Sequence, residues 1–224
     1  MRNPYRRRAH ISTRDFQKLL RLFCEDIPAL SSARLLGLNK NSTHDFYGRL
    51  RQRLFALALA EARPVTGEVE IDESYFGPYR VRGQRGRAAA KKTPVIGLLK
   101  RRGRVFTAVI ANASKREILP VIRGQVLPSA TIYTDGWPSY DGLVIDGYKH
   151  YRIHHQKNEF ARGRQHINGI ESFWAYAKTR MVKLRGIRKT KFLLHLKETE
   201  WRWNHRRDNL YLILLQELKK HPLN

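Results

Sequence analysis

The stretch VEIDESYFG, residues 69–77, decides how the rest of the chain is interpreted. Its apolar residues alternate in part with polar ones, which predicts a β-strand. Pro64 and Gly67 mark a boundary just before it, because the preceding segment has a helical period and this one does not. The predicted strand contains Asp72, and a second aspartate, Asp135, ends a later predicted strand.

Segments on the C-terminal side predict a mixed sheet with helices packed on it. Further strands are predicted over residues 94–100, 104–111, 130–136 and 148–155. Helices are predicted over residues 114–126 and 164–186, with one or two more over residues 191–220. This mixture of strands and helices in one continuous segment indicates an α/β domain.

The segment on the N-terminal side, residues 13–60, predicts a small all-helical domain. A short helix, a turn at Gly37 and a longer Arg-rich helix capped by Asn41, Ser42 or Thr43 form the pattern of a helix-turn-helix motif. An ordinary helical hairpin has the same pattern. The basic surroundings favour the interpretation as a DNA-binding motif.

The composition is strongly basic, with 44 Lys and Arg against 19 Asp and Glu, a formal net charge of +25. Such a surplus binds nucleic-acid phosphates by releasing counterions, although a basic surface without a ligand is the simpler alternative. No acidic residue lies between Arg80 and Arg104, a stretch rich in cations. The residues predicted to contact DNA are Arg49, Arg51, Arg53, Arg82, Arg85, Arg87, Lys91 and Lys92.

The sequence also argues against several classes of protein. It has no apolar run of about eighteen residues, so no spanning helix is predicted. No apolar segment of signal-peptide length follows the basic start. Cys24 is the only cysteine, which excludes an internal disulfide and a cysteine-based zinc site and indicates a reducing compartment.

Three carboxylates are candidates for a metal-dependent site. Asp72 and Asp135 lie on predicted strands, and Glu171 lies near the start of a later predicted helix. Two strand carboxylates and one helix carboxylate can converge on one face of a sheet. Two-metal phosphoryl transfer needs such a set, and carboxylate oxygens suit Mg²⁺ or Mn²⁺.

The helical period places Lys178 near Glu171. The two residues are seven apart and therefore share one flank of the predicted helix, beside its apolar stripe. A lysine there could contact a phosphate while the glutamate ligates metal. A surface Glu and Lys on an amphipathic helix is the common alternative, and Asn168, one turn earlier on the same flank, competes with Glu171 as third ligand.

Three motifs in order, VEIDESYFG (69–77), IYTDGWPSY (132–140) and HINGIESFWAYAK (166–178), resemble the catalytic core of DDE transposases of bacterial insertion sequences. The resemblance implies an RNase H-like fold, two Mg²⁺ or Mn²⁺ ions, and DNA strand cleavage and strand transfer. It implies that Asp72, Asp135 and Glu171 form the metal-binding triad and that Lys178 is the accompanying base. Many members begin with a zinc ribbon of paired cysteines, for which this sequence has only Cys24.

The resemblance also implies partners and a location. Double-stranded DNA, as element ends and as target, is the expected partner, with no membrane partner. A homodimer or larger assembly is expected when two element ends are joined. The expected location is the bacterial cytoplasm, in association with the nucleoid. A DNA-binding regulator with a catalytically inactive RNase H-like domain is the alternative, and a basic RNA- or ribosome-associated protein is a third possibility.

The expected fold is therefore an α/β, RNase H-like mixed sheet with flanking helices, preceded by a small helix-turn-helix domain. The domains are predicted as a basic arm over 1–12, a helix-turn-helix domain over 13–63, a catalytic domain over 65–188 and a helical tail, packed on the catalytic core, over 189–224.

Overall fold

The computed structural model describes residues 3–6, 11–77, 92–136, 138–141, 143–144, 146–153, 166–184 and 186–223. The chain divides into two compact units. We call Met1–Ala60 with Lys189–Asn224 the head unit, and Glu61–Arg188 the sheet unit. Among the described residues, no helix is long and apolar enough to cross a membrane.

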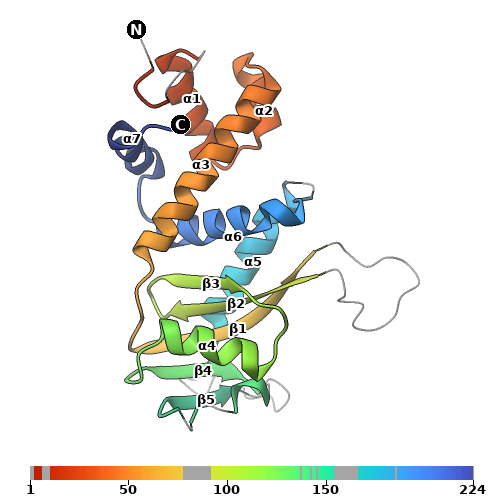
Figure 1. The fold of residues 1–224 in the computed structure, drawn as a ribbon, viewed down its shortest axis with the longest axis vertical. Helices are drawn as coiled ribbons and strands as arrows, with labels where there is room; N and C mark the ends of the chain where they lie inside the picture. Colours follow the sequence, from red (N-terminus) through yellow and green to blue (C-terminus); the bar gives the residue numbers. More distant parts are fainter. Residues whose placement is uncertain are drawn as a thin grey trace, which may run out of the picture. The chain divides into compact units, whose positions relative to one another are not determined.

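The sheet unit contains, in the part of the chain that the structure describes, one five-stranded sheet (Figure 1). Its strands are β1 (Glu68–Phe76), β2 (Thr93–Lys100), β3 (Val105–Val109), β4 (Thr131–Asp135) and β5 (Lys149–Ile153). Their order is β3-β2-β1-β4-β5. β2 is antiparallel to both neighbours, whereas β1, β4 and β5 are parallel. An antiparallel β1–β2–β3 meander extended by two parallel strands is the RNase H-like arrangement, so the predicted fold class is confirmed.

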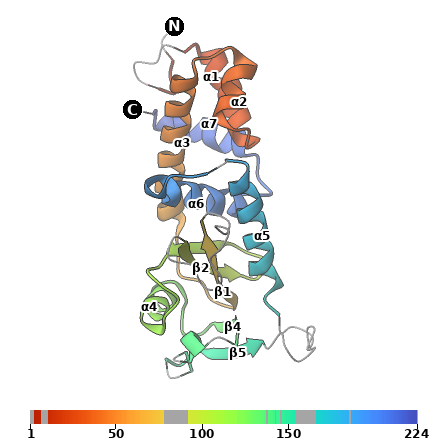
Figure 2. The same ribbon diagram turned by 90° about the vertical axis from the view of Figure 1, so that its right-hand side faces the viewer.

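Two helices cover opposite faces of this sheet (Figure 2). They are α4 (Lys115–Gln125), which continues through Pro120, and α5 (Asn168–Val182). Side chains alternate between the faces along each strand. Val69 and Ile71 of β1 belong to the apolar core that includes Ile118 and Ile122 of α4. The even-numbered residues of β1 therefore lie on the face covered by α5.

The α5 face is closely packed at Gly97 of β2. A Cβ atom there would lie 2.6 Å from the Trp174 ring of α5, so that only glycine fits without displacing the helix. Phe76 contacts the same ring, with a centroid separation of 5.9 Å. This packing fixes where α5 crosses the first two strands.

The head unit is helical. Its helices are α1 (Thr13–Cys24), α2 (Ala29–Leu36), α3 (Lys40–Glu61), α6 (Lys189–Asn204) and α7 (Leu210–Lys220). α2 ends at Gly37, whose φ of +63° closes the helix in the left-handed region. The predicted cap of α3 was two to four residues too late: Asn39 is the cap, because its Oδ1 accepts from the backbone N–H groups of Asn41 and Ser42. The helix-turn-helix segment thus has the expected secondary structure.

The core of the head unit combines both ends of the chain. Trp201 of α6 and Leu218 of α7 belong to one buried cluster with Phe16, Leu20 and Tyr47 from the N-terminal helices. We predicted that the C-terminal tail packs on the catalytic core. The structure instead groups 189–224 with the head, because the apolar faces of α6 and α7 complete the core of the N-terminal helices.

A buried charge network holds α6 in this core. Glu198, 1% exposed in its side chain, accepts from Arg202 Nε at 3.0 Å and from Arg51 Nε at 2.8 Å. Arg202 also donates to the backbone carbonyls of Phe23 and Cys24 at the end of α1. Every charge in this network has a partner, which is the condition under which buried charges are tolerated.

Arg202→Ala should therefore destabilise the head unit by about 3–5 kcal/mol, since it removes a partner of the buried Glu198 carboxylate and two hydrogen bonds to the carbonyls of Phe23 and Cys24. The measurement is urea denaturation followed by circular dichroism. The matched control is Arg206→Ala, which removes an exposed arginine close by on the chain. Equal unfolding midpoints for the two variants would contradict the structural role of Arg202.

Candidate active site

Asp72 and Asp135 lie on adjacent parallel strands, each two residues beyond the last pair of the β1–β4 ladder. β1 and β4 pair with Glu70 beside Tyr133, an offset of 63 residues (133 − 70 = 63). The same offset separates the two aspartates (135 − 72 = 63), so continuing the register by two residues brings Asp72 beside Asp135. Residues two apart on a strand face the same side, which here is the side covered by α5.

Helix α5 carries Glu171 and Lys178 across this face. Gly97, the register partner of Asp72 on β2, is the residue against which Trp174 packs. Glu171 and Lys178 are three residues before and four residues after Trp174, so all three lie on one side of the helix. Glu171 and Lys178 are exposed, while Trp174 is buried, and this leaves both charged groups accessible to a ligand.

The electrostatics of Asp72 connect the four predicted residues. Burial raises the pKa of Asp72 to about 6. The carboxylates of Asp135 and Glu171 contribute to this rise in pKa, and the Lys178 ammonium opposes it. The other three predicted catalytic residues therefore lie within electrostatic range of Asp72. The assignment of their catalytic roles stays a prediction.

Glu73, next to Asp72, points to the opposite face, as strand alternation requires. The pKa of Glu73 is raised to about 7, chiefly by burial; the nearby Tyr140 hydroxyl opposes the rise, and the Asp72 and Asp135 carboxylates contribute to it. Tyr140 is itself fully buried and belongs to the core on the α4 side. A further carboxyl, that of Glu73, thus lies near the acidic site on the opposite face of β1.

The chemistry of these side chains fits a hard dication. Asp72, Asp135 and Glu171 offer oxygen ligands, and their mutual repulsion at Asp72 is relieved by added positive charge. Within the described residues, no three His, Cys, Asp or Glu side chains lie as close together as the ligands of one ion do. The fit rests on donor type and electrostatics.

The sequence interpretation did not assign a role to Glu70, which the structure places at the start of α5. Glu70 is 1% exposed and accepts from the Ile170 backbone N–H at 2.9 Å and from Arg101 Nε at 2.9 Å. Arg101 also donates to the His166 carbonyl oxygen. The sequence did contain one indication: Glu70 and Asp72 are two residues apart on one predicted strand, so their side chains share a face of the sheet.

The arginines of α3 that we predicted to bind DNA have partners inside the protein. Arg49 Nε lies 3.0 Å from Asp45, and Arg53 Nη1 lies 3.3 Å from Glu217. Arg51 is bound to Glu198, and its side chain is only 13% exposed. Arg51 therefore has a structural role in the head unit. Contacts of these residues with DNA stay a prediction.

The basic loop that we predicted to contact DNA lies mostly outside the described residues. Lys92, just before β2, is described and exposed. Those outside the described part of the chain are Arg82, Arg85, Arg87 and Lys91. Their role in binding DNA also stays a prediction.

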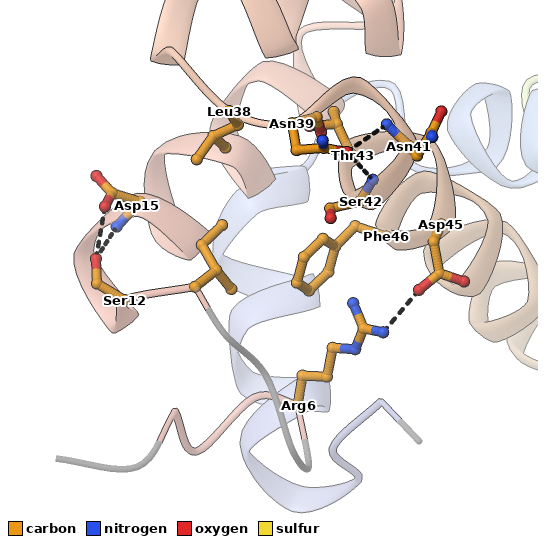
Figure 3. Close-up of a pocket in the computed structure, with 11 residues that line it drawn as sticks. Arg6, Ser12, Asp15, Leu38, Asn39, Asn41, Ser42, Thr43, Asp45 and Phe46 are labelled. Atoms are coloured by element: carbon orange, nitrogen blue, oxygen red, sulfur yellow. Dashed lines mark hydrogen bonds and ion pairs between the residues drawn. The ribbon is translucent and has the colours of Figure 1, made fainter.

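A pocket of about 560 Å³ lies in the head unit at the N-terminal end of α3 (Figure 3). Asn39 caps the helix on one side of it, and on another side Arg6 Nη2 bonds Asp45 at 2.6 Å. Phe46 lies between these two polar groups. The pocket shares no residue with the acidic site of the sheet unit.

An RNase H-like sheet with two aspartates at equivalent positions on neighbouring parallel strands defines an α/β protein with an acidic site, a class that includes enzymes acting on nucleic acids. The family model of the ISXO2-like transposase domain matches residues 64–204, and the chain belongs to this family. The predicted resemblance to insertion-sequence transposases is thereby confirmed.

Individual relatives agree with the family. An uncharacterized transposase-like protein of Haemophilus influenzae is 40% identical over 120 residues, which cover 54% of this chain and 97% of the relative. An uncharacterized protein in the transposable element ISH50 of Halobacterium salinarum is 32% identical over 171 residues, covering 68% of this chain and 58% of the relative. The crystal structure of a pre-cleavage Mos1 transpososome aligns with a TM-score of 0.26 and 13% identity, over 96% of this chain and 82% of that one.

Proposed function

We propose that this protein is a transposase that cleaves DNA strands at the ends of an insertion sequence and transfers them to a target. The observation that supports the proposal is that Asp72 and Asp135 occupy equivalent positions on neighbouring parallel strands, with Asp135, Glu171 and Lys178 all acting electrostatically on Asp72. Family membership supports the same function.

Asp72, Asp135 and Glu171 would hold two divalent ions, Mg²⁺ or Mn²⁺. The ions would supply the positive charge that activates the attacking oxygen of water or of a 3′-hydroxyl and stabilises the leaving oxygen. The two aspartates offer ligands from the sheet, and Glu171 offers one from the helix that covers it. Because Asp72 is on β1, at the centre of the sheet, the rigid part of the fold would fix the ligand geometry.

Lys178 would contact a phosphate oxygen of the strand being cut. It is exposed, it lies on the side of α5 that bears Glu171, and its charge is felt at Asp72. An ammonium group beside a carboxylate cluster also reduces the repulsion that the incoming phosphate meets. Lys178 thus acts on substrate rather than on the ions.

The head unit would bind the element ends as duplex, with the start of α3 in the major groove. Lys40, Asn41, Ser42 and His44 are exposed in its first turn and a half. Synapsis of two ends calls for at least a dimer. The net charge of +25 supports binding to the phosphate backbone of DNA.

The test is incubation of the purified protein with linear DNA that carries the element ends, with and without Mg²⁺. A transposase produces nicks with 3′-hydroxyl termini at the ends and, later, joined products. A DNA-binding regulator shifts the same DNA in a gel but leaves both strands intact in Mg²⁺ and in Mn²⁺, and this outcome would replace the proposal by that alternative.

Metal binding should weaken as the pH falls through 6. Carboxylates bind metal in the deprotonated form, and a group with a pKa of about 6 is only about one quarter ionised at pH 5.5. Asp72 alone should therefore weaken Mn²⁺ binding about fourfold between pH 7.5 and pH 5.5. The measurement is titration of Mn²⁺ followed by the electron paramagnetic resonance of the free ion. Equal affinity at the two pH values would contradict a role for Asp72 as ligand.

A further inference from the structure

We propose that Glu70 is a positioning residue of the acidic site: its buried carboxylate fixes the first turn of α5 on β1 and thereby sets where Glu171 stands relative to Asp72. This inference rests on the proposed function, because Glu171 matters only if it is a ligand. It assigns a role to a carboxylate outside the predicted triad.

The first turn of α5 lacks a cap of its own. Ile167, at the N-cap position, gives no side-chain hydrogen bond to the helix. Glu70 Oε2 supplies the missing acceptor by bonding the Ile170 N–H at 2.9 Å, across one hundred residues of sequence. A negative charge at a helix N-terminus is also electrostatically favourable.

The approach of α5 to Glu70 leaves no spare room. A Cβ atom at Gly169 would lie 2.8 Å from Glu70 Oε2 and 2.6 Å from a methyl carbon of Leu99, which is the register partner of Glu70 on β2. The start of α5 is therefore in close contact with β1 and β2 at Gly169. Glu171 is the next residue after Ile170, so its backbone position follows from this contact.

Arg101 prevents Glu70 from being an isolated buried charge. Its guanidinium bonds Glu70 Oε1, the half-buried Glu68 at 3.2 Å and the His166 carbonyl just before α5, and it stacks 3.9 Å from the centre of the Tyr133 ring. We call the Glu70–Arg101 pair the anchor. It bonds the chain on both sides of the start of α5, at the His166 carbonyl and at the Ile170 N–H. Glu70 and Asp72 share one face of β1, so one strand supplies both a ligand and the support of the helix that carries another.

The experiment measures Mn²⁺ affinity of the full chain by electron paramagnetic resonance, together with amide hydrogen exchange in the first turn of α5. Glu70→Gln keeps the shape but loses the charge, and should weaken Mn²⁺ binding about 10- to 100-fold, the range found when groups that orient metal ligands are removed. The exchange of the Ile170 amide should become faster. Glu68→Gln is the matched control, because it removes a carboxylate from Arg101 but leaves the bond to Ile170; its Mn²⁺ affinity should stay close to that of the wild type.

A second variant perturbs the same contact without changing charge. Gly169→Ala pushes the helix start away from Glu70 and should weaken Mn²⁺ binding in the same direction. Gly124→Ala in α4 is its control, because nothing lies within 4 Å of the added methyl group. This pair keeps the proposal testable if Glu70→Gln fails to fold.

The outcomes are distinct. Wild-type Mn²⁺ affinity in Glu70→Gln or in Gly169→Ala, alongside faster exchange at Ile170, would overturn the proposal and leave Glu70 as a helix cap only. Wild-type Mn²⁺ affinity in Asp135→Asn would instead overturn the metal site itself. Weakened binding in both anchor variants, with both controls unchanged, supports the positioning role.

Discussion

Asp135→Asn should reduce strand cleavage in Mg²⁺ by roughly a thousandfold or more, the size of loss seen when one member of a catalytic unit is removed. The substitution replaces a ligand oxygen by an amide and removes one negative charge from the pair that continues the β1–β4 register. Binding to the element ends should be largely unchanged, since phosphate contacts supply most of the affinity. Cleavage is measured on end-labelled DNA, and binding by gel shift at matched salt.

The control for this variant is Asp141→Asn. It removes an equal charge from the same unit, from an exposed aspartate paired with Arg152. Its cleavage rate should stay within about twofold of the wild type, as expected of a surface substitution. If Asp135→Asn nicks DNA at the wild-type rate, the assignment of the aspartate pair fails.

Glu171→Gln should lower cleavage about a hundredfold or more, because it removes a negative charge that α5 contributes to the surroundings of Asp72. Asn168→Ala should have a milder effect, through the start of α5. Both residues are exposed on the same helix, so the two substitutions are matched in their setting. One cleavage time course with Mn²⁺ titrated for each variant separates them.

The reverse result has a definite meaning. If Asn168→Ala loses as much activity as Asp135→Asn while Glu171→Gln stays near normal, Asn168 is the third ligand. The two aspartates would keep their role in that case, because their placement depends on strand register and not on α5.

Much of the sheet unit could be predicted because its signals are local. The alternation around Asp72, the turn at Arg102 and Gly103, and the apolar stripe of α5 each specify an element within a few residues. Asp72 and Asp135 could be brought together as well, since strands in a parallel sheet present equivalent positions on one face.

The remainder depends on contacts that the local pattern does not specify. The sequence of an amphipathic helix such as α7 indicates which side is buried but not which element covers it. The tail was therefore predicted to pack on the catalytic core, whereas it belongs to the head unit. The anchor at Glu70 joins a strand to a helix start one hundred residues later, and no spacing rule indicates it. Arg51 has the same difficulty, because its partner Glu198 is 147 residues away.

The head unit is closed by its two chain ends: the Leu223 N–H donates to the Tyr5 carbonyl at 2.8 Å, and Trp201 and Leu218 lie in the core of the N-terminal helices. During synthesis on the ribosome, the first helices emerge without the segments that complete their core. The unit can be finished only after the residues up to Leu223 have left the exit tunnel. A premature stop codon or a frameshift between the codons for α3 and α7 would therefore yield a product with an incomplete head unit.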